Sequence, residues 1–170
     1  MSNPILTGEQ LLANLVNAAN PTHKQWLAEE LIFGVPQSQV GDFNTTISVT
    51  AVDTNGFSGT RQLSYLRVDL AGASQSLPEE LELNGEQNTL QIAARLRELY
   101  KVNLEDVDVI DEELPLGDGG VITQVIKAAP GSLKWIGQIT IMLSPRVIPL
   151  EEVIVVTELN GLSLAQLAIP

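Results

Sequence analysis

Hydrophobic positions near the start of the chain recur at the spacing of a helix. Leu11 and Leu15 lie four residues apart, and the apolar side chains beside them complete a stripe along one face of residues 7–19. Thr7 and Gln10 precede this stripe in the order of a capping box, in which each side chain binds the other residue's backbone N–H. The pattern predicts an amphipathic helix over residues 7–19.

A second helical pattern occurs in the middle of the chain. Ile92, Leu96 and Leu99 repeat at helical spacing. Asn88 stands before them as a candidate N-cap residue, because its side-chain oxygen can accept a hydrogen bond from a free backbone N–H of the first turn. We expect this second amphipathic helix to run to about Lys101.

Alternation with a period of two begins at Phe43 and predicts a half-buried strand over residues 43–51. A second strand is predicted over residues 61–70, but its alternation slips by one residue near Tyr65 and Leu66. We predict a bulge or a kink there, because a bulge adds one residue to a strand and would return the apolar side chains to one face. Other strands are predicted at residues 31–33, 106–110, 121–128, 133–143 and 152–157.

The order of these elements predicts an α+β fold that is mainly β, with antiparallel hairpins or a sandwich-like sheet and two short amphipathic helices. Pro130-Gly131, a pair favoured at the centre of a type II turn, connects two of the strands. We expect one compact domain over residues 1–145, with possible lobes at 1–73 and 79–145. Residues 146–170 are then a C-terminal arm or a last strand.

The composition narrows the classes of function. The chain has 170 residues, of which 44% are hydrophobic, and 9 basic against 21 acidic side chains give a net charge of -12. Such a charge disfavours binding to nucleic acid or to an anionic membrane surface. No apolar run approaches the roughly 20 residues of a membrane span, and the first residues lack the features of a secretion signal. We therefore expect a soluble protein made in a cytoplasm.

The residue types that carry most catalysis are scarce. The chain has no cysteine and one histidine, His23, so disulfides, thiolate zinc sites, cysteine nucleophiles and multi-histidine metal sites are excluded. No serine stands in a Gly-x-Ser-x-Gly elbow. Trp26 and Trp135 are interpreted as core or interface anchors rather than ligand platforms. We predict that the protein is not an enzyme and has no cofactor.

An acidic stretch over residues 105–113 is the best candidate for a cation site, because calcium binds converging oxygen ligands. The stretch departs from an EF-hand loop at Ile110 and Asp111. The favoured interpretation is a solvated sheet edge whose charge opposes edge-to-edge aggregation.

The segment from Pro145 to Pro170 is apolar in a way that free chain ends usually are not. A strand there would be apolar on both faces and would need cover on both sides. We predict an arm that adds a strand to, or packs against, another chain. The alternative is an ordinary last strand and helix of the same domain. The predicted interface residues are Val153, Ile154, Val155, Val156, Leu162, Leu164 and Leu167.

Several short segments of the sequence carry a family likeness. They are Asn44-Thr45-Thr46-Ile47-Ser48-Val49-Thr50-Ala51-Val52, Gly56-Phe57-Ser58-Gly59, Arg67-Val68-Asp69-Leu70, Ala128-Ala129-Pro130-Gly131-Ser132-Leu133-Lys134-Trp135-Ile136-Gly137 and Leu159-Asn160-Gly161-Leu162. Together these segments resemble small virion structural proteins of tailed bacteriophages. The likeness covers most of residues 30–162.

The resemblance implies a non-enzymatic component of the tail, the neck or the head surface. Its expected partners are other virion proteins and copies of itself, in a particle assembled after synthesis in the bacterial host cytoplasm. The alternative, from a different class, is a free-standing β-rich binding module for a cation or a glycan. A hydrolase with carboxylate chemistry is a remote third possibility, because no two acidic residues are paired by their spacing.

Overall fold

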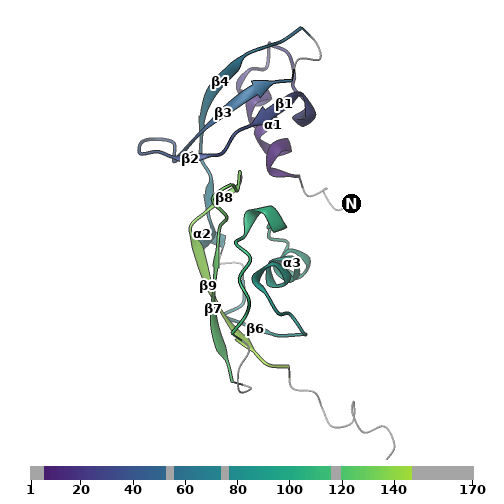
Figure 1. Ribbon diagram of the computed structural model, residues 1–170, viewed down its shortest axis with the longest axis vertical. Helices are drawn as coiled ribbons and strands as arrows, with labels where there is room; N and C mark the ends of the chain where they lie inside the picture. The colour runs from purple at the N-terminus through teal and green to yellow at the C-terminus, as the bar shows by residue number, and fades with distance from the viewer. Residues whose placement is uncertain (1–5, 53–55, 74–76, 116–119, 147–170) are drawn as a thin grey trace, which may run out of the picture.

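The computed structural model describes residues 6–52, 56–73, 77–115 and 120–146. These residues form two lobes that lie end to end (Figure 1). Each lobe combines a helix with a small β-sheet, so the mainly β, α+β class predicted from the sequence is confirmed.

The N-terminal lobe holds a four-stranded sheet with β3 at its centre. β4 pairs with one side of β3, while β1 and β2 pair one after the other with its opposite side, all antiparallel. The bounds are β1 Leu31–Phe33, β2 Gln37–Ser38, β3 Thr45–Ala51 and β4 Thr60–Tyr65. A 3₁₀ turn, η1 (Ala28–Glu30), precedes β1.

The helix of this lobe, α1 (Gly8–Ala19), begins where the sequence predicts. Thr7 and Gln10 form the expected capping box, with bonds of 3.0 and 3.2 Å between each side chain and the other residue's backbone N–H. Leu12 of α1 packs against the sheet with Ile47, Val49 and Tyr65, and these four residues form the buried cluster of the lobe.

The chain crosses to the second lobe immediately after β4. The predicted strand over residues 61–70 is wrong as a single element, because the pairing with β3 ends at Tyr65. Val68–Asp69 form a separate strand, β5, which pairs in parallel with β8 (Trp135–Ile136). The ladder is therefore interrupted near Tyr65 and Leu66, as predicted, but by a change of strand partner rather than by a bulge. Leu70 already belongs to the core of the second lobe.

The C-terminal lobe is built on a three-stranded sheet with β9 in the middle. β7 pairs with β9 in the antiparallel direction and β6 in the parallel direction. The bounds are β6 Glu80–Glu82, β7 Ile122–Lys127, β9 Gln138–Ser144, α2 Leu70–Ala73 and α3 Thr89–Tyr100. Asn88 caps α3 by accepting from the backbone N–H of Gln91 at 3.0 Å, as predicted.

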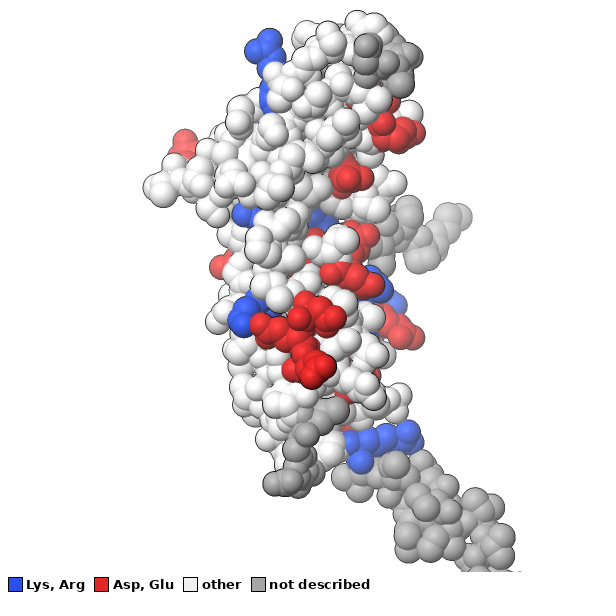
Figure 2. Space-filling view, viewed as in Figure 1, with Lys and Arg blue, Asp and Glu red and all other residues white. Residues whose placement is uncertain are grey.

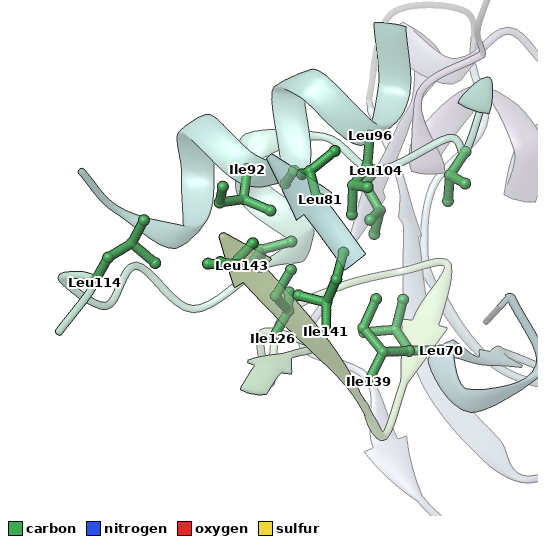
Figure 3. Packing of buried hydrophobic residues seen from close by; sticks show 13 residues of the cluster. Leu70, Leu81, Ile92, Leu96, Leu104, Leu114, Ile126, Ile139, Ile141 and Leu143 are labelled. Carbon is green, nitrogen blue, oxygen red and sulfur yellow. The ribbon is translucent and has the colours of Figure 1, made fainter. Parts of the chain in front are cut away.

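Helix α3 covers one face of this sheet and closes the main core. Ile92 and Leu96 of α3 point toward Ile141 and Leu143 of β9 (Figure 3), and all four are almost fully buried. Thirteen buried hydrophobic residues belong to this cluster, whereas the N-terminal lobe buries four in its own.

Two further expectations are corrected by the fold. Residues 106–110 are not a strand: Asp106–Asp108 form a 3₁₀ turn, η3, and only Val109 makes an isolated bridge, to Ala128. The strand predicted over 133–143 is divided by Gly137, whose φ of 76° directs the chain from β8 into β9.

The connection between β7 and β8 also differs from its predicted form. The turn at Pro130-Gly131 is closed by a 2.9 Å bond from the N–H of Ser132 to the carbonyl of Ala129. Gly131 is not among the glycines with positive φ, and a type II turn requires a positive φ there. The predicted turn position is therefore right, and its type is wrong.

Candidate functional site

A buried polar network lies where the two lobes meet. Arg67, which is only 7% exposed, donates from Nε to the hydroxyl of Thr45 (2.9 Å) and from Nη1 to the carbonyl of Ser132 (3.0 Å). The side chain of Asn44 binds both the N–H and the carbonyl of Arg67, each at 2.8 Å. Arg67 therefore joins the first residue of β3 to the loop before β8.

The network continues into the C-terminal lobe through an acid–lysine cluster. The hydroxyl of Ser132 donates to Asp108 at 2.6 Å. The ammonium of Lys134 lies 2.8 Å from Asp108 and 2.6 Å from Glu105, and it also donates to the side chain of Asn103 at 3.2 Å. Lys134 and Asp108 are both buried, so their mutual attraction must offset the loss of hydration that burial costs each charge.

The geometry of this network suits a structural clamp better than a catalytic centre. A catalytic serine needs access to a substrate as well as a base. Ser132 is 1% exposed, and its oxygen also accepts from the backbone N–H groups of Lys134 (3.3 Å) and Trp135 (3.0 Å). His23 takes no part in the network, because it lines a cavity of the N-terminal lobe.

Burial changes the acid–base behaviour of two residues beside the network. Burial raises the pKa of Tyr65, and the nearby positive charge of Arg67 opposes this only in part. Burial likewise lowers the pKa of Arg67 from its ordinary value. The hydroxyl of Tyr65 has no hydrogen-bond partner within the described residues. The core of the N-terminal lobe thus contains an uncompensated polar group.

The acidic stretch over 105–113 does not form a cation site in the described structure. Its carboxylates are held by lysines instead: Glu105 and Asp108 bind Lys134, and Glu112 binds Lys127 at 2.7 Å. No group of three or more acidic or histidine side chains is arranged around a metal position in the parts of the chain that are described. The solvated-edge interpretation is also wrong for Asp108, which is 1% exposed.

A cavity of about 610 Å³ opens between the end of α1 and strands β3 and β4. The rings of Trp26 and Phe57 line it, edge to face, with centroids 5.2 Å apart. The ammonium of Lys24 lies 4.8 Å from the centre of the Trp26 ring and is paired with Glu30 at 2.8 Å. Arg61 also contributes to the wall. The cavity therefore combines aromatic faces with polar groups, which is a composition found in ligand sites.

The two tryptophans have different surroundings. Trp135 packs against the C-terminal core and donates from its indole N–H to the carbonyl of Asn103 at 2.8 Å, which fits the predicted role of an anchor. Trp26 instead lines the open cavity.

Exposed apolar side chains are concentrated on the N-terminal lobe. Of thirteen large hydrophobic residues that are exposed in the described structure, eight lie between residues 6 and 66. Val40 is fully exposed on the loop before β3. The eight are Leu15, Leu27, Ile32, Val35, Val40, Phe43, Phe57 and Leu66.

The interface residues predicted from the sequence all lie outside the described residues. These are Val153, Ile154, Val155, Val156, Leu162, Leu164 and Leu167.

Sequence reasoning missed the residues of the junction. Alternation along residues 133–143 assigns Lys134 to the solvent face, opposite Leu133 and Trp135. Lys134 is buried because Glu105 and Asp108, distant in the sequence, fold over it. No local pattern in residues 133–143 distinguishes Lys134 from a lysine that faces solvent.

The fold and the junction define a two-lobed α+β protein whose lobes are joined by buried polar contacts. Residues 1–166 match the family of unknown function DUF7941, and the chain belongs to that family. Neither the curated proteins nor the solved structures include a significant match to the chain. Within the described residues, no helix is long and apolar enough to cross a membrane.

Proposed function

We propose that this protein is a non-enzymatic structural subunit of a tailed-bacteriophage particle, in the tail, the neck or the head surface, and that it assembles in multiple copies. The observation that carries the assembly role is the unequal distribution of apolar side chains. The C-terminal lobe has a core of thirteen buried hydrophobic residues, whereas the N-terminal lobe has a buried cluster of four and exposes eight large hydrophobic residues. Exposed apolar surface of this kind typically marks contact with another protein.

The strand edges support the same role. β4 pairs with one strand within the described residues, so it presents a second edge to a neighbour. The second edge of β7 is open except at its end, where the carbonyl of Lys127 accepts from the N–H of Ile110 at 3.0 Å. An unpaired edge is a ready site for strand addition from another chain. The apolar segment that includes Val153–Val156 supplies a further contact in this proposal. The particle itself is suggested by the sequence resemblance and not by the geometry.

Mass spectrometry of purified particles tests this proposal. We expect the chain in particles of the phage that encodes it, at more than one copy per particle, after repeated density-gradient purification. A truncation after Arg146 keeps the bond from Arg146 to Asn84 (3.2 Å) and removes the apolar segment. We expect the truncated chain to fold but to be lost from the particle. Absence of the full chain from purified particles would overturn the proposal.

The cavity beside Trp26 favours one second candidate, a glycan-binding module. Aromatic rings can stack on sugar rings, and side-chain amide and guanidinium groups can bond to sugar hydroxyls. The cavity offers both kinds of group, in Trp26 and Phe57 and in Asn20 and Arg61. A glycan array with the wild-type protein and Trp26→Ala tests it. Binding that is lost with Trp26→Ala supports the second candidate, and no binding by the wild type contradicts it.

A further inference from the structure

The sheet of the N-terminal lobe has an outer face, opposite the face that packs on α1. In the register of β3 and β4, the outward side chains stand opposite each other: Thr46 with Ser64, Ser48 with Gln62, and Thr50 with Thr60. Ile32 and Gln37 extend this face onto β1 and β2, opposite Thr50 and Thr46. We call it the neutral face; it consists of Ile32, Gln37, Thr46, Ser48, Thr50, Thr60, Gln62 and Ser64.

Side chains on the neutral face are held in place before any partner arrives. Thr46 donates to the side chain of Gln62 at 2.9 Å, and the hydroxyls of Thr50 and Thr60 lie 2.8 Å apart. Ordering these groups in the free protein lowers the entropy that association would otherwise cost.

The neutral face is also flat next to β1. A Cβ at Gly34 would lie 2.3 Å from the hydroxyl oxygen of Ser48, so no side chain fits there without displacing that serine. Ile32, two residues before Gly34 on the same face, is 58% exposed. It supplies apolar area at the margin of an otherwise polar surface.

Charge decides which partner fits. Two copies of a chain with a net charge of -12 repel each other over most of their surfaces. The eight residues of the neutral face include no charged side chain. In Figure 2 the middle of the N-terminal lobe is largely uncharged, while acidic side chains gather on the C-terminal lobe. Contact between two neutral faces therefore places no carboxylate of one face against a carboxylate of the other.

The hydrogen-bonding groups point to the same partner. A two-fold contact places the same surface on both sides, so the surface must complement itself. Ser, Thr and Gln side chains can each donate and accept hydrogen bonds. Seven of the eight residues of the neutral face, all except Ile32, are of these types. A face of this kind can bond to its own copy, which a face of one charge cannot.

We propose that the neutral face binds the neutral face of a second copy of this chain and forms a two-fold dimer. The inference rests on the proposed function as a self-assembling subunit, and it names the surface and the partner.

The test places carboxylates on this face and compares them with a matched pair elsewhere. The variant Thr60→Glu/Gln62→Glu changes two exposed positions two residues apart on β4. The control Gln138→Glu/Thr140→Glu changes the same residue types at the same spacing, at exposed positions of β9 in the other lobe. Both variants carry the same net charge. Sedimentation velocity measures association from low to high micromolar concentrations, and circular dichroism verifies folding.

We expect the wild type and the control to dimerise with similar affinity, and Thr60→Glu/Gln62→Glu to weaken dimerisation by at least about tenfold, because like charges across an interface are strongly unfavourable. Thr60→Lys/Gln62→Lys should also be monomeric alone and should form a heterodimer when mixed with the glutamate variant. The lysine variant keeps the test decisive if the glutamate variant does not fold.

A wild type that stays monomeric throughout, or equal dimerisation of all variants, would overturn this inference. Particle mass spectrometry remains a separate readout. If the chain is present in particles and the charge variants are incorporated normally, the neutral face is not the contact and the proposed function stands. If the chain dimerises through this face but is absent from particles, the proposed function fails and the contact stands.

Discussion

The two lobes use their hydrophobic residues in opposite ways. The C-terminal lobe gathers thirteen of them into one core between α3 and the β7–β9 sheet, whereas the N-terminal lobe gathers four into its buried cluster and exposes eight large ones. Burial of apolar area is the main favourable contribution to folding. The difference indicates that the C-terminal lobe supplies most of the stability and that the N-terminal lobe is available for contact.

The junction explains how a lobe with a small core keeps a fixed position. Arg67 ties the N-terminal sheet to the loop that carries Ser132, and Lys134 ties that loop to Asp108. Gly8, the first residue of α1, also fits closely there, because a Cβ on it would lie 2.9 Å from the Cβ of Leu133. Buried and directional bonds of this kind fix the orientation of the lobes more narrowly than apolar contact alone.

The largest effect is expected from breaking the junction. Lys134→Met removes the cation that neutralises Asp108 and Glu105, and leaving a buried charge unpaired costs about 3–5 kcal/mol. Lys127→Met is the matched control, because its pair with Glu112 is much more exposed than the junction and a solvent-exposed pair contributes only about 0–1 kcal/mol. Urea unfolding measures both. Equal losses of stability in the two variants would contradict a special role for the junction.

The next effect compares the two cores directly. Ile126→Ala in the C-terminal core should lower the free energy of unfolding by about 2–5 kcal/mol. Ile47→Ala in the N-terminal core should fall at the lower end of that range, because a small cluster with partly exposed neighbours can collapse into the space left by the removed side chain. Trp26 and Trp135 report on the two lobes separately, so each can be kept as a single fluorophore by changing the other to Phe.

With Ile47→Ala we expect the Trp26 transition to occur at a lower urea concentration than the Trp135 transition. With Ile126→Ala both transitions should move together, since the N-terminal lobe depends on the C-terminal one. Coincident transitions in both variants would show that the lobes form one cooperative unit and that the division drawn from their cores is wrong.

Local patterns in the sequence predicted much of this fold. The caps at Thr7 and Asn88 and the strand alternation around Ile47 depend on neighbouring residues, and the structure confirms them. The strand over 106–110 failed because Asp108 turns back to accept from the backbone N–H of Glu105 at 3.0 Å. The alternation of aspartate and valine over residues 106–110 is typical of a strand and gives no indication of that hydrogen bond.

The candidate site was much less predictable than the elements. Arg67 and Lys134 are buried by groups that come from other parts of the chain, and alternation alone assigns such charged residues to solvent. The neutral face depends on the register between β3 and β4, which the sequence does not specify. The predicted interface around Val153 stays a prediction, because it lies outside the described residues.

The smallest expected effect concerns the core of the N-terminal lobe. The hydroxyl of Tyr65 is buried without a hydrogen-bond partner in the described residues, and an unsatisfied polar group of this kind destabilises a fold. Tyr65→Phe should therefore stabilise the protein, by about 1 kcal/mol at neutral pH. Tyr100→Phe, at the half-buried end of α3, is the control, and we expect no comparable gain from it.

The same substitution predicts a dependence on pH. Because burial raises the pKa of Tyr65 in the folded protein above its ordinary value of 10.0, only the unfolded chain ionises readily as the pH passes 10. Ionisation of Tyr65 therefore leaves the free energy of unfolding unchanged below that pH and lowers it above that pH, because it favours the unfolded chain. The advantage of Tyr65→Phe over the wild type should consequently grow between pH 8 and pH 10.5 in urea unfolding. An advantage that stays constant or shrinks over this interval would mean that the Tyr65 hydroxyl reaches solvent or a partner, and the N-terminal core would then be better satisfied than its four buried residues indicate.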